Sequence, residues 1–529
     1  MKRITAETSS QPNDRKLVGR KARPTDWLAR VRRGSGFMPD INTWVGVALA
    51  VLVLPLLATA TTDRPNVVLI MCDDLNDYIE PMNGHPQALT PQLDRLARSG
   101  VVFNQAHTNV PVCGSARGSM FTGIYPHNSG LFGFNRWDGY EVLQNSRTLM
   151  HHFRANGYYT LGTGKLMHHE VNSEWDTFVH AADYGPFPTD GEERYAHPDV
   201  LPPYSEIGAV DGSFGPLVSL AGRTSKTGKP LHWNTGRWGS QRILRVDGPE
   251  DRDQTADEIN GDWAVEKLEK IAADSDDKPF FMGVGFMRPH TPLIVPQRFF
   301  DMFPLEEIQL PEIRPDDIDD THARSVRTLL GGWEPGRNRS EDMGRRLFED
   351  LVASYPENDE GLRRFIQAYL ASVASVDEQI GKILDAIDGS PLRENTVIIF
   401  TSDHGWGMGE KDYLYKNSLW QESTQVPLIV RAPGLAPDGP DAALTALYKW
   451  RERYDPGRES YALRSRDWRY IRYENGREEL YHTAEDPLEW INLADDPAHL
   501  AALETYRARL RDRVPLPGRD LPQPGVNLN

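Results

Sequence analysis

The chain has 529 residues and a formal net charge of −17, a length that suits one large domain and a smaller one. Basic residues cluster in the first forty positions, so the charge of the remainder argues against nucleic acid as a partner. Cys72 and Cys113 are the only cysteines, so no disulfide framework is predicted, although the two could form one bridge.

The N-terminal segment has the layout of a targeting signal. After the basic stretch, an apolar run at residues 44–57 closes with Ala58-Thr59-Ala60, a small-x-small cleavage pattern. The run is marginal for a bilayer span, which needs about 20 residues. We therefore expect residues 1–60 to direct export to the periplasm or the extracellular space, with retention as an N-terminal membrane anchor as the alternative.

From Asn66 onward, short apolar runs alternate with segments of helical periodicity, which predicts an α/β fold. The first run is continuously apolar, as expected of a buried parallel strand, and we expect Cys72 to be a buried residue at its end. Thr90 followed by Pro91 predicts a helix start with Thr90 as its cap. The predicted strands cover residues 66–72, 101–103, 158–164, 279–286 and 396–402, and the predicted helices cover residues 90–97, 148–156, 255–272 and 362–387.

Two regions have few apolar runs. Residues 183–252 are predicted to form long loops on the substrate side, and residues 312–358 are also predicted to be loop-like. Beyond residue 433 the pattern predicts antiparallel strands at 461–464 and 468–473, with Asn475-Gly476 as the hairpin turn. The predicted organisation is a leader at 1–60, a catalytic domain at 65–434, a short bridge at 435–459, an antiparallel subdomain with a last helix at 460–514, and a loose tail at 515–529.

Acidic residues follow two of the predicted strands. Asp73 and Asp74 come directly after the first strand, and Asp403 with His404 follows residues 396–402. Ligands gather at the carboxyl ends of parallel strands, so we expect these side chains to meet. Carboxylates that lie together repel one another unless a cation neutralises them. The sequence therefore predicts a divalent cation site, with Ca²⁺ favoured over Mg²⁺ because it tolerates irregular coordination better.

The segment that begins at Cys113 resembles the signature of the sulfatase family. That signature has Cys or Ser at its first position, any residue at the second, Pro or Ala at the third, Ser at the fourth and Arg at the fifth, and it leads into a Thr-Gly pair. Cys113, Arg117 and Thr122-Gly123 match it, whereas Ser115 and Ala116 depart from it. The chain is most similar to the iduronate-2-sulfatase branch, through residues 164–168, 285–292, 401–406, 409–410, 416 and 486–493. The resemblance implies an alkaline-phosphatase-like sandwich, with a large mostly parallel sheet between helices and a small C-terminal antiparallel sheet.

The resemblance also implies a mechanism and a substrate. A separate formylglycine-generating enzyme would oxidise Cys113 to formylglycine, whose hydrated aldehyde would attack sulfur and release the alcohol; its second hydroxyl would then expel sulfate. The substrate would be a sulfated sugar or polysaccharide. The cation would be held by Asp73, Asp74, Asp403 and His404 together with the modified Cys113.

The resemblance also implies roles for the remaining site residues. Arg117 would hold the nucleophile segment, while Lys165, His290 and Lys416 would bind the sulfate oxygens. Either His168 or His290 would donate or accept a proton. We expect the two lysines and His290 to be exposed on the catalytic face, and Trp406 to be either core packing or a platform for a sugar ring.

Two other functions compete with this hypothesis. A phosphodiester or phosphonate hydrolase on the same fold is the alternative within the enzyme class. A catalytically silent glycan-binding relative is the alternative outside it, motivated by Ser115-Ala116 and by the short bridge at residues 435–459, which lacks a helix-bearing segment that the family normally carries.

Overall fold

The computed structural model describes residues 64–514, except for gaps at 237–239, 275–277, 315–316, 319, 322–342, 358, 434–441, 448–456 and 458. The predicted leader, most of the bridge and the predicted tail therefore lie outside the described residues. The chain divides into two compact units, residues 1–61 and 62–529, and the fold below is that of the second unit. Among the helices described, none has the length and apolar character needed to cross a membrane.

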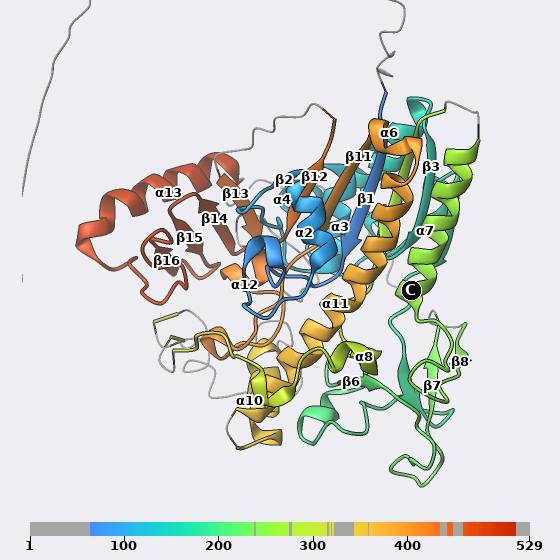
Figure 1. The fold of residues 1–529 in the computed structure, drawn as a ribbon. Coiled ribbons are helices and arrows are strands. Elements are labelled where there is room, and N and C mark those ends of the chain that lie inside the picture. Colours follow the sequence, from blue (N-terminus) through green and yellow to red (C-terminus); the bar gives the residue numbers. More distant parts are fainter. Residues whose placement is uncertain are drawn as a thin grey trace, which may run out of the picture. The chain divides into compact units, whose positions relative to one another are not determined.

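Within the described residues, a seven-stranded sheet lies at the centre of this unit, with strand order β2-β12-β11-β1-β9-β3-β4 (Figure 1). The five strands from β11 to β4 in this order run parallel to one another. At one edge of the sheet, β12 pairs antiparallel with β11, and β2 pairs antiparallel with β12. Strands β1 and β11 pair along their whole length and end side by side at Cys72 and Ser402. The bounds are β1 Asn66–Cys72, β2 Val101–Val102, β3 Tyr159–Gly164, β4 Thr177–Ala181, β9 Phe280–Gly285, β11 Thr396–Ser402 and β12 Leu428–Arg431.

Helices cover both faces of this sheet, as the alternation of β1 shows. Val68 and Ile70 pack in one apolar core with the helices of one face, while Leu69 and Met71 pack in a second core with those of the other. Every residue of β1 is buried, which confirms the predicted buried parallel strand. The first face carries α2 (Pro91–Arg98), α7 (Ala256–Ala273) and α11 (Glu360–Asp388), and the second carries α3 (Cys113–Thr122), α5 (Glu141–Gln144) and α6 (Leu149–Ala155).

The helix caps show where local signals hold and where they fail. Helix α7 begins with the capping box of Thr255 and Glu258. Thr90 precedes α2, but its hydroxyl accepts the N–H of Glu80 at 2.9 Å and does not cap the helix. The carboxylate of Asp377 in α11 accepts two N–H groups of the first turn of α2 instead, at 2.9 and 3.0 Å. The prediction of Thr90 as the cap is therefore wrong, because a residue nearly three hundred positions away supplies the acceptor.

Regular structure also occurs in both regions that were predicted as loops. In the part of the chain that the structure describes, β5 (Phe187–Thr189), β7 (His232–Thr235) and β8 (Arg242–Leu244) form a three-stranded antiparallel sheet. These strands are too short to show an alternating pattern, and distant pairing stabilises them. Further short elements are β6 (Phe214–Leu217), which pairs with β10 (Leu293–Pro296), and the helices α4 (Pro126–Ser129), α8 (Gln297–Phe300), α10 (Met343–Ser354) and α12 (Gln421–Thr424).

The C-terminal sheet contains the predicted hairpin, and it gains a further strand, β13, from residues that were predicted as the bridge. Among the described residues it contains four antiparallel strands in the order β13-β14-β15-β16, with Gly476 in the hairpin turn at φ 81°. Helix α13 packs on this sheet through Leu503 and Tyr506, in an apolar cluster that also contains Ala116 of α3. The small sheet thus supports the helix that carries Cys113. The bounds are β13 Ala442–Ala446, β14 Tyr461–Ser465, β15 Arg469–Arg472, β16 Glu478–Tyr481 and α13 Leu500–Arg513.

Candidate active site

The carboxyl ends of the central parallel strands meet at the first residue of α3. Val112 is extended, and the helix begins at Cys113, whose residue is 1% exposed. The described structure contains no disulfide, and both cysteines are buried. Around Cys113 lie side chains that follow β1 (Asp73, Asp74), β3 (Lys165), β9 (His290) and β11 (Asp403, His404), together with Arg117 and Lys416.

Arg117 connects α3 to the ends of three strands. Its Nε donates to Asp403 Oδ2 at 2.7 Å, and its Nη2 donates to the carbonyl of Cys72 at 3.1 Å. Its Nη1 donates to the carbonyls of Lys165 and Leu166. The guanidinium is fully buried, so these hydrogen bonds replace its lost hydration and hold the Cys113 helix against the sheet.

Two lysines pair with the two adjacent aspartates. Lys165 Nζ donates to Asp73, and Lys416 Nζ lies 3.0 Å from Asp74 Oδ1 and 3.5 Å from Cys113 Sγ. The residues Lys165 and Lys416 are 0% and 3% exposed, and His290 is 5% exposed. The expectation that these groups are exposed is therefore wrong. A buried ammonium must keep a carboxylate partner, so these lysines also contribute to folding.

The two histidines of the site direct different atoms toward it. His290 Nδ1 lies 2.5 Å from the carbonyl of Thr291, to which it must donate, so Nε2 carries the lone pair of the neutral ring and lies 3.8 Å from Asp74 Oδ2. Burial and the Lys416 ammonium hold the pKa of His290 well below its usual range. His404 Nε2 lies 3.7 Å from Asp403 Oδ2 and has no hydrogen-bond partner among the described residues.

His168 lies farther out than the other predicted residues. It packs against the rings of Phe134 and His169, with centroids 5.3 and 4.7 Å away. Burial, with Lys165 adding to it, lowers the pKa of His168 to about 2. Trp406 is 1% exposed and stacks on Phe365, so it is core packing and not a platform for a sugar ring.

The acidic cluster fits a divalent cation. Ligand atoms of Asp73, Cys113, Asp403 and His404 lie within 4.8 Å of one another, and Asp73 Oδ1 has no hydrogen-bond partner within the described chain. Burial raises the pKa of Asp74 to about 7, even though Lys416 opposes the shift. Burial would also raise the pKa of Asp73, but the Lys165 ammonium and the Arg117 guanidinium outweigh it and hold that pKa well below its usual range. Buried carboxylate oxygens with unused acceptor capacity are the ligands that Ca²⁺ and Mg²⁺ prefer.

The shifted Asp74 predicts that cation affinity falls as the pH drops below 7. Between pH 3.8 and about 7, Asp74 keeps its proton in the folded state, whereas the unfolded chain has released it. Because the folded state binds the extra proton, the contribution of Asp74 to the stability of the cation-free protein decreases as the pH rises through this window. A cation must displace this proton, so we expect affinity to fall by up to about tenfold per pH unit below 7.

Titration calorimetry with Ca²⁺, in buffers of different ionisation enthalpy, would count the released proton. Asp77 and Glu410 also have raised pKa values, about 6 and about 7, mainly because of burial, but neither belongs to the ligand clusters found in the described chain. Cation affinity is therefore a cleaner measure than stability. An affinity that does not change with pH, or no difference in slope between the parent and Asp74→Asn, would contradict the prediction.

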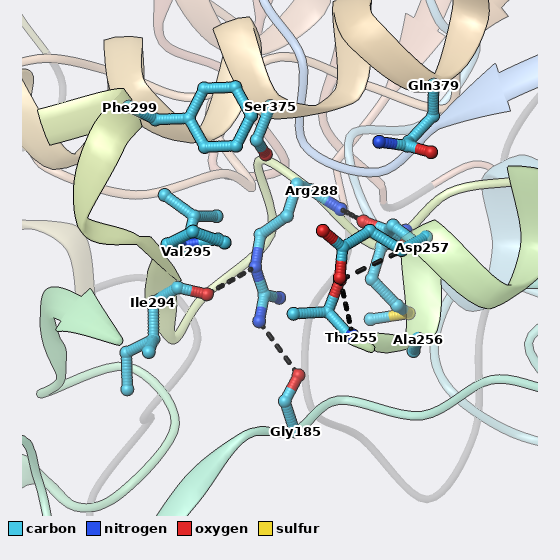
Figure 2. Close-up of a pocket in the computed structure, with 13 residues that line it drawn as sticks. Gly185, Thr255, Ala256, Asp257, Arg288, Ile294, Val295, Phe299, Ser375 and Gln379 are labelled. Atoms are coloured by element: carbon cyan, nitrogen blue, oxygen red, sulfur yellow. Dashed lines mark hydrogen bonds between the residues drawn. The ribbon is translucent and has the colours of Figure 1, made fainter. Parts of the chain in front are cut away.

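The structure adds two residues that the sequence did not single out. Figure 2 shows the Arg288 side chain reaching between the carbonyls of Gly185 and Ile294, while the carboxylate of Asp257 accepts the backbone N–H of Arg288 at 3.0 Å. Arg288 Nη1 also donates to the carbonyl of His290 at 3.1 Å. A charged residue shortly after a predicted buried strand was the available signal for Arg288. For Tyr184, which contacts both Lys165 and His290, the sequence offered no signal.

A mostly parallel sheet between helices, a buried polar site at its carboxyl edge and a small antiparallel sheet define an alkaline-phosphatase-like fold. Residues 65–450 match the family model described as Sulfatase, and the chain belongs to the sulfatase family.

Three similar proteins illustrate the range of relatives. A sulfatase from Formosa agariphila is 31% identical over 85% of this chain and 86% of its own length. Mouse iduronate 2-sulfatase is 30% identical over 89% of this chain and 74% of its own length. In three dimensions the fold is similar to that of the phosphonate monoester hydrolase of Agrobacterium radiobacter, with a TM-score of 0.59, 20% identity, and coverage of 84% of this chain and 95% of that one.

Proposed function

We propose that the protein hydrolyses a sulfate ester of a sulfated sugar or polysaccharide, using formylglycine derived from Cys113 and a divalent cation, with Ca²⁺ favoured over Mg²⁺. The observation that carries this proposal is the position of Cys113. It begins α3 with its sulfur 3.5 Å from Lys416 Nζ and within the carboxylate cluster. When bound, the cation and the modified residue supply a nucleophile that standard side chains cannot provide.

The charged side chains of the site form two sets: carboxylates that would bind the cation and lysines that would bind the sulfate group. Among the described residues, Asp73 and Cys113 belong to one ligand cluster with Asp403 and His404 and to a second with Asp74 and His290, and the cation would be held by ligands from these clusters. Lys165 and Lys416 bring positive charge to the same place, where they would bind sulfate oxygens and stabilise charge that develops on them. His290 presents the lone pair of Nε2 and would accept a proton there. His168 is the weaker candidate, because it packs among aromatic rings at the edge.

The relatives guide the choice of substrate class. The name of the mouse relative, iduronate 2-sulfatase, supports a sulfated sugar, whereas the fold shared with a phosphonate monoester hydrolase keeps that chemistry as the second candidate. The silent glycan-binding alternative rests on Ser115 and Ala116 and on the short bridge at residues 435–459, most of which lies outside the described residues. The Ser115 hydroxyl donates to the carbonyl of Phe132 at 3.1 Å, and Ala116 packs against the C-terminal sheet. Both substitutions are accommodated by packing within the described structure, which weakens the case for loss of activity.

The test compares the two chemistries on protein produced with a formylglycine-generating enzyme. Sulfate release from an aryl sulfate and from a panel of sulfated sugars is measured beside hydrolysis of a phosphonate monoester. The proposal expects the higher kcat/KM for sulfate esters. The opposite ranking would favour the phosphonate hydrolase, and no turnover by protein with fully modified Cys113 would favour the silent relative.

Replacing Lys416 with alanine should lower turnover by about 10²–10³-fold, because a charge-stabilising contact is lost. Removing a buried partner also leaves Asp74 unpaired, at a cost of about 3–5 kcal/mol in the free energy of unfolding. Lys411→Ala is the matched control: Lys411 is also 3% exposed and pairs with Asp317 at 2.8 Å, outside the site. Both variants should melt early, but only Lys416→Ala should lose turnover per folded molecule. Equal loss of turnover in the two would show that the effect is structural.

We also propose that residues 1–60 direct export, and that the catalytic domain and the C-terminal subdomain follow the boundaries given by the sequence, except that β13 of the predicted bridge joins the C-terminal sheet. N-terminal sequencing of the mature protein distinguishes cleavage near residue 60 from retention as an anchor.

A further inference from the structure

Tyr184 lies between the two groups that would meet a sulfate ester. Lys165 Nζ is 4.7 Å from the centroid of its ring, over the ring face. The His290 ring meets it edge to face, with centroids 5.1 Å apart and planes at 77°. Lys165 and His290 are buried, whereas Tyr184 is half-buried. The tyrosine therefore contacts both groups from the more exposed side of the site.

The backbone on both sides of Tyr184 is fixed by polar contacts. Asp183 Oδ2 accepts the hydroxyl of Thr235 at 2.7 Å and the N–H of Gly236 at 2.6 Å, which ties it to the end of β7. The carbonyl of Gly185 accepts Arg288 Nη2 at 2.8 Å (Figure 2). Because Arg288 also donates to the carbonyl of His290, the loop that carries Tyr184 and the turn that carries His290 share one anchor.

This arrangement matters because a lysine side chain is flexible. Lys165 is paired with Asp73, but a carboxylate accepts an ammonium from many directions and does not by itself define where the ammonium lies. The face of an aromatic ring attracts a cation, most strongly when both are removed from water. The ring of Tyr184 supplies that second contact, and its packing against His290 limits the rotation of the imidazole.

We propose that Tyr184 is a positioning residue, whose ring holds the Lys165 ammonium and the His290 imidazole in the relative arrangement that the sulfate group meets. This inference rests on the proposed function. The cation–π and edge-to-face contacts are made by the ring, and the hydroxyl also interacts with Lys165. Because the inference assigns the positioning to the ring, we expect phenylalanine to replace tyrosine.

The experiment compares Tyr184→Phe and Tyr184→Leu with the parent, after modification of Cys113, for kcat and KM on an aryl sulfate. Tyr184→Phe should keep kcat within about threefold, and Tyr184→Leu should lose about 30-fold in kcat, the equivalent of a desolvated cation–π contact, with a smaller change in KM. Tyr159→Leu is the matched control. Tyr159 is also half-buried and has Lys278 Nζ 5.7 Å from its ring centroid, but it lies at the opposite end of β3 from Lys165. Its kcat per folded molecule should equal that of the parent.

A second readout separates this inference from the proposed function. Binding of inorganic sulfate to the cation-loaded proteins, measured by calorimetry, should weaken about tenfold in Tyr184→Leu and remain unchanged in Tyr184→Phe. If Tyr184→Leu does not fold, Tyr184→Met takes its place in both measurements. Parent-like kcat and sulfate affinity in the leucine variant would overturn the inference, and so would an equal loss in the phenylalanine variant, which would assign the effect to the hydroxyl. A parent protein without turnover would overturn the proposed function, and sulfate affinity would still decide the role of Tyr184.

Discussion

Cys113→Ala is expected to reduce turnover of a sulfate ester by at least about 10³-fold, because no neighbouring side chain can replace the nucleophile. In the parent protein, produced with a formylglycine-generating enzyme, the peptide that contains Cys113 should lose one sulfur and two hydrogens and gain one oxygen. Peptide mass spectrometry measures this change, and the fraction modified should scale with kcat across preparations.

Cys72→Ala is the matched control for this prediction. Cys72 is the other cysteine of the chain and is also buried, at the end of β1, where its side chain belongs to an apolar core. Its removal should cost about 1 kcal/mol in the free energy of unfolding and leave turnover per folded molecule unchanged. A Cys113→Ala protein with full activity, or activity that follows Cys72 instead, would refute the role of Cys113.

Asp403→Asn is expected to weaken cation binding by at least about 100-fold and to abolish turnover with it. Asp403 Oδ2 accepts Arg117 Nε at 2.7 Å, and Oδ1 accepts the N–H of Asp74 at 3.2 Å, so the carboxylate organises the site as well as facing the cation. Asparagine keeps the shape but removes the charge. The alanine variant would also remove the hydrogen-bond acceptors for Arg117 Nε and for the N–H of Asp74, so asparagine is the better test. Elemental analysis of the purified protein measures the cation directly.

Asp377→Asn provides the control for a buried carboxylate outside the site. Asp377 is 2% exposed and caps α2, so the variant should lose about 1 kcal/mol of stability and keep its cation and its turnover. A stoichiometric cation in Asp403→Asn would remove Asp403 from the ligand set. Loss of the cation in both variants would show that folding, and not ligation, controls binding.

The sequence alone was sufficient for the features that depend on local pattern. The continuous apolar runs of β1 and β11 predicted both strands with the bounds that the structure has, because a strand buried on both faces needs no polar alternation. The parallel arrangement then required Asp73 and Asp403 to meet, since parallel strands end at one edge of their sheet. The capping box of α7 and the Asn475-Gly476 turn are likewise short-range signals.

Tertiary structure decided the features whose partners lie far away in the chain. Asp377 replaced Thr90 as the cap of α2, and the strands of residues 183–252 exist because they pair with one another or with β10. The burial of Lys165 and Lys416 could not be read from residue type, because an ammonium is buried only where folding supplies a carboxylate such as Asp73 or Asp74. Tyr184 gains its contacts with Lys165 and His290 in the same way: loops that are separate in sequence come together only when the sheet orders its strands.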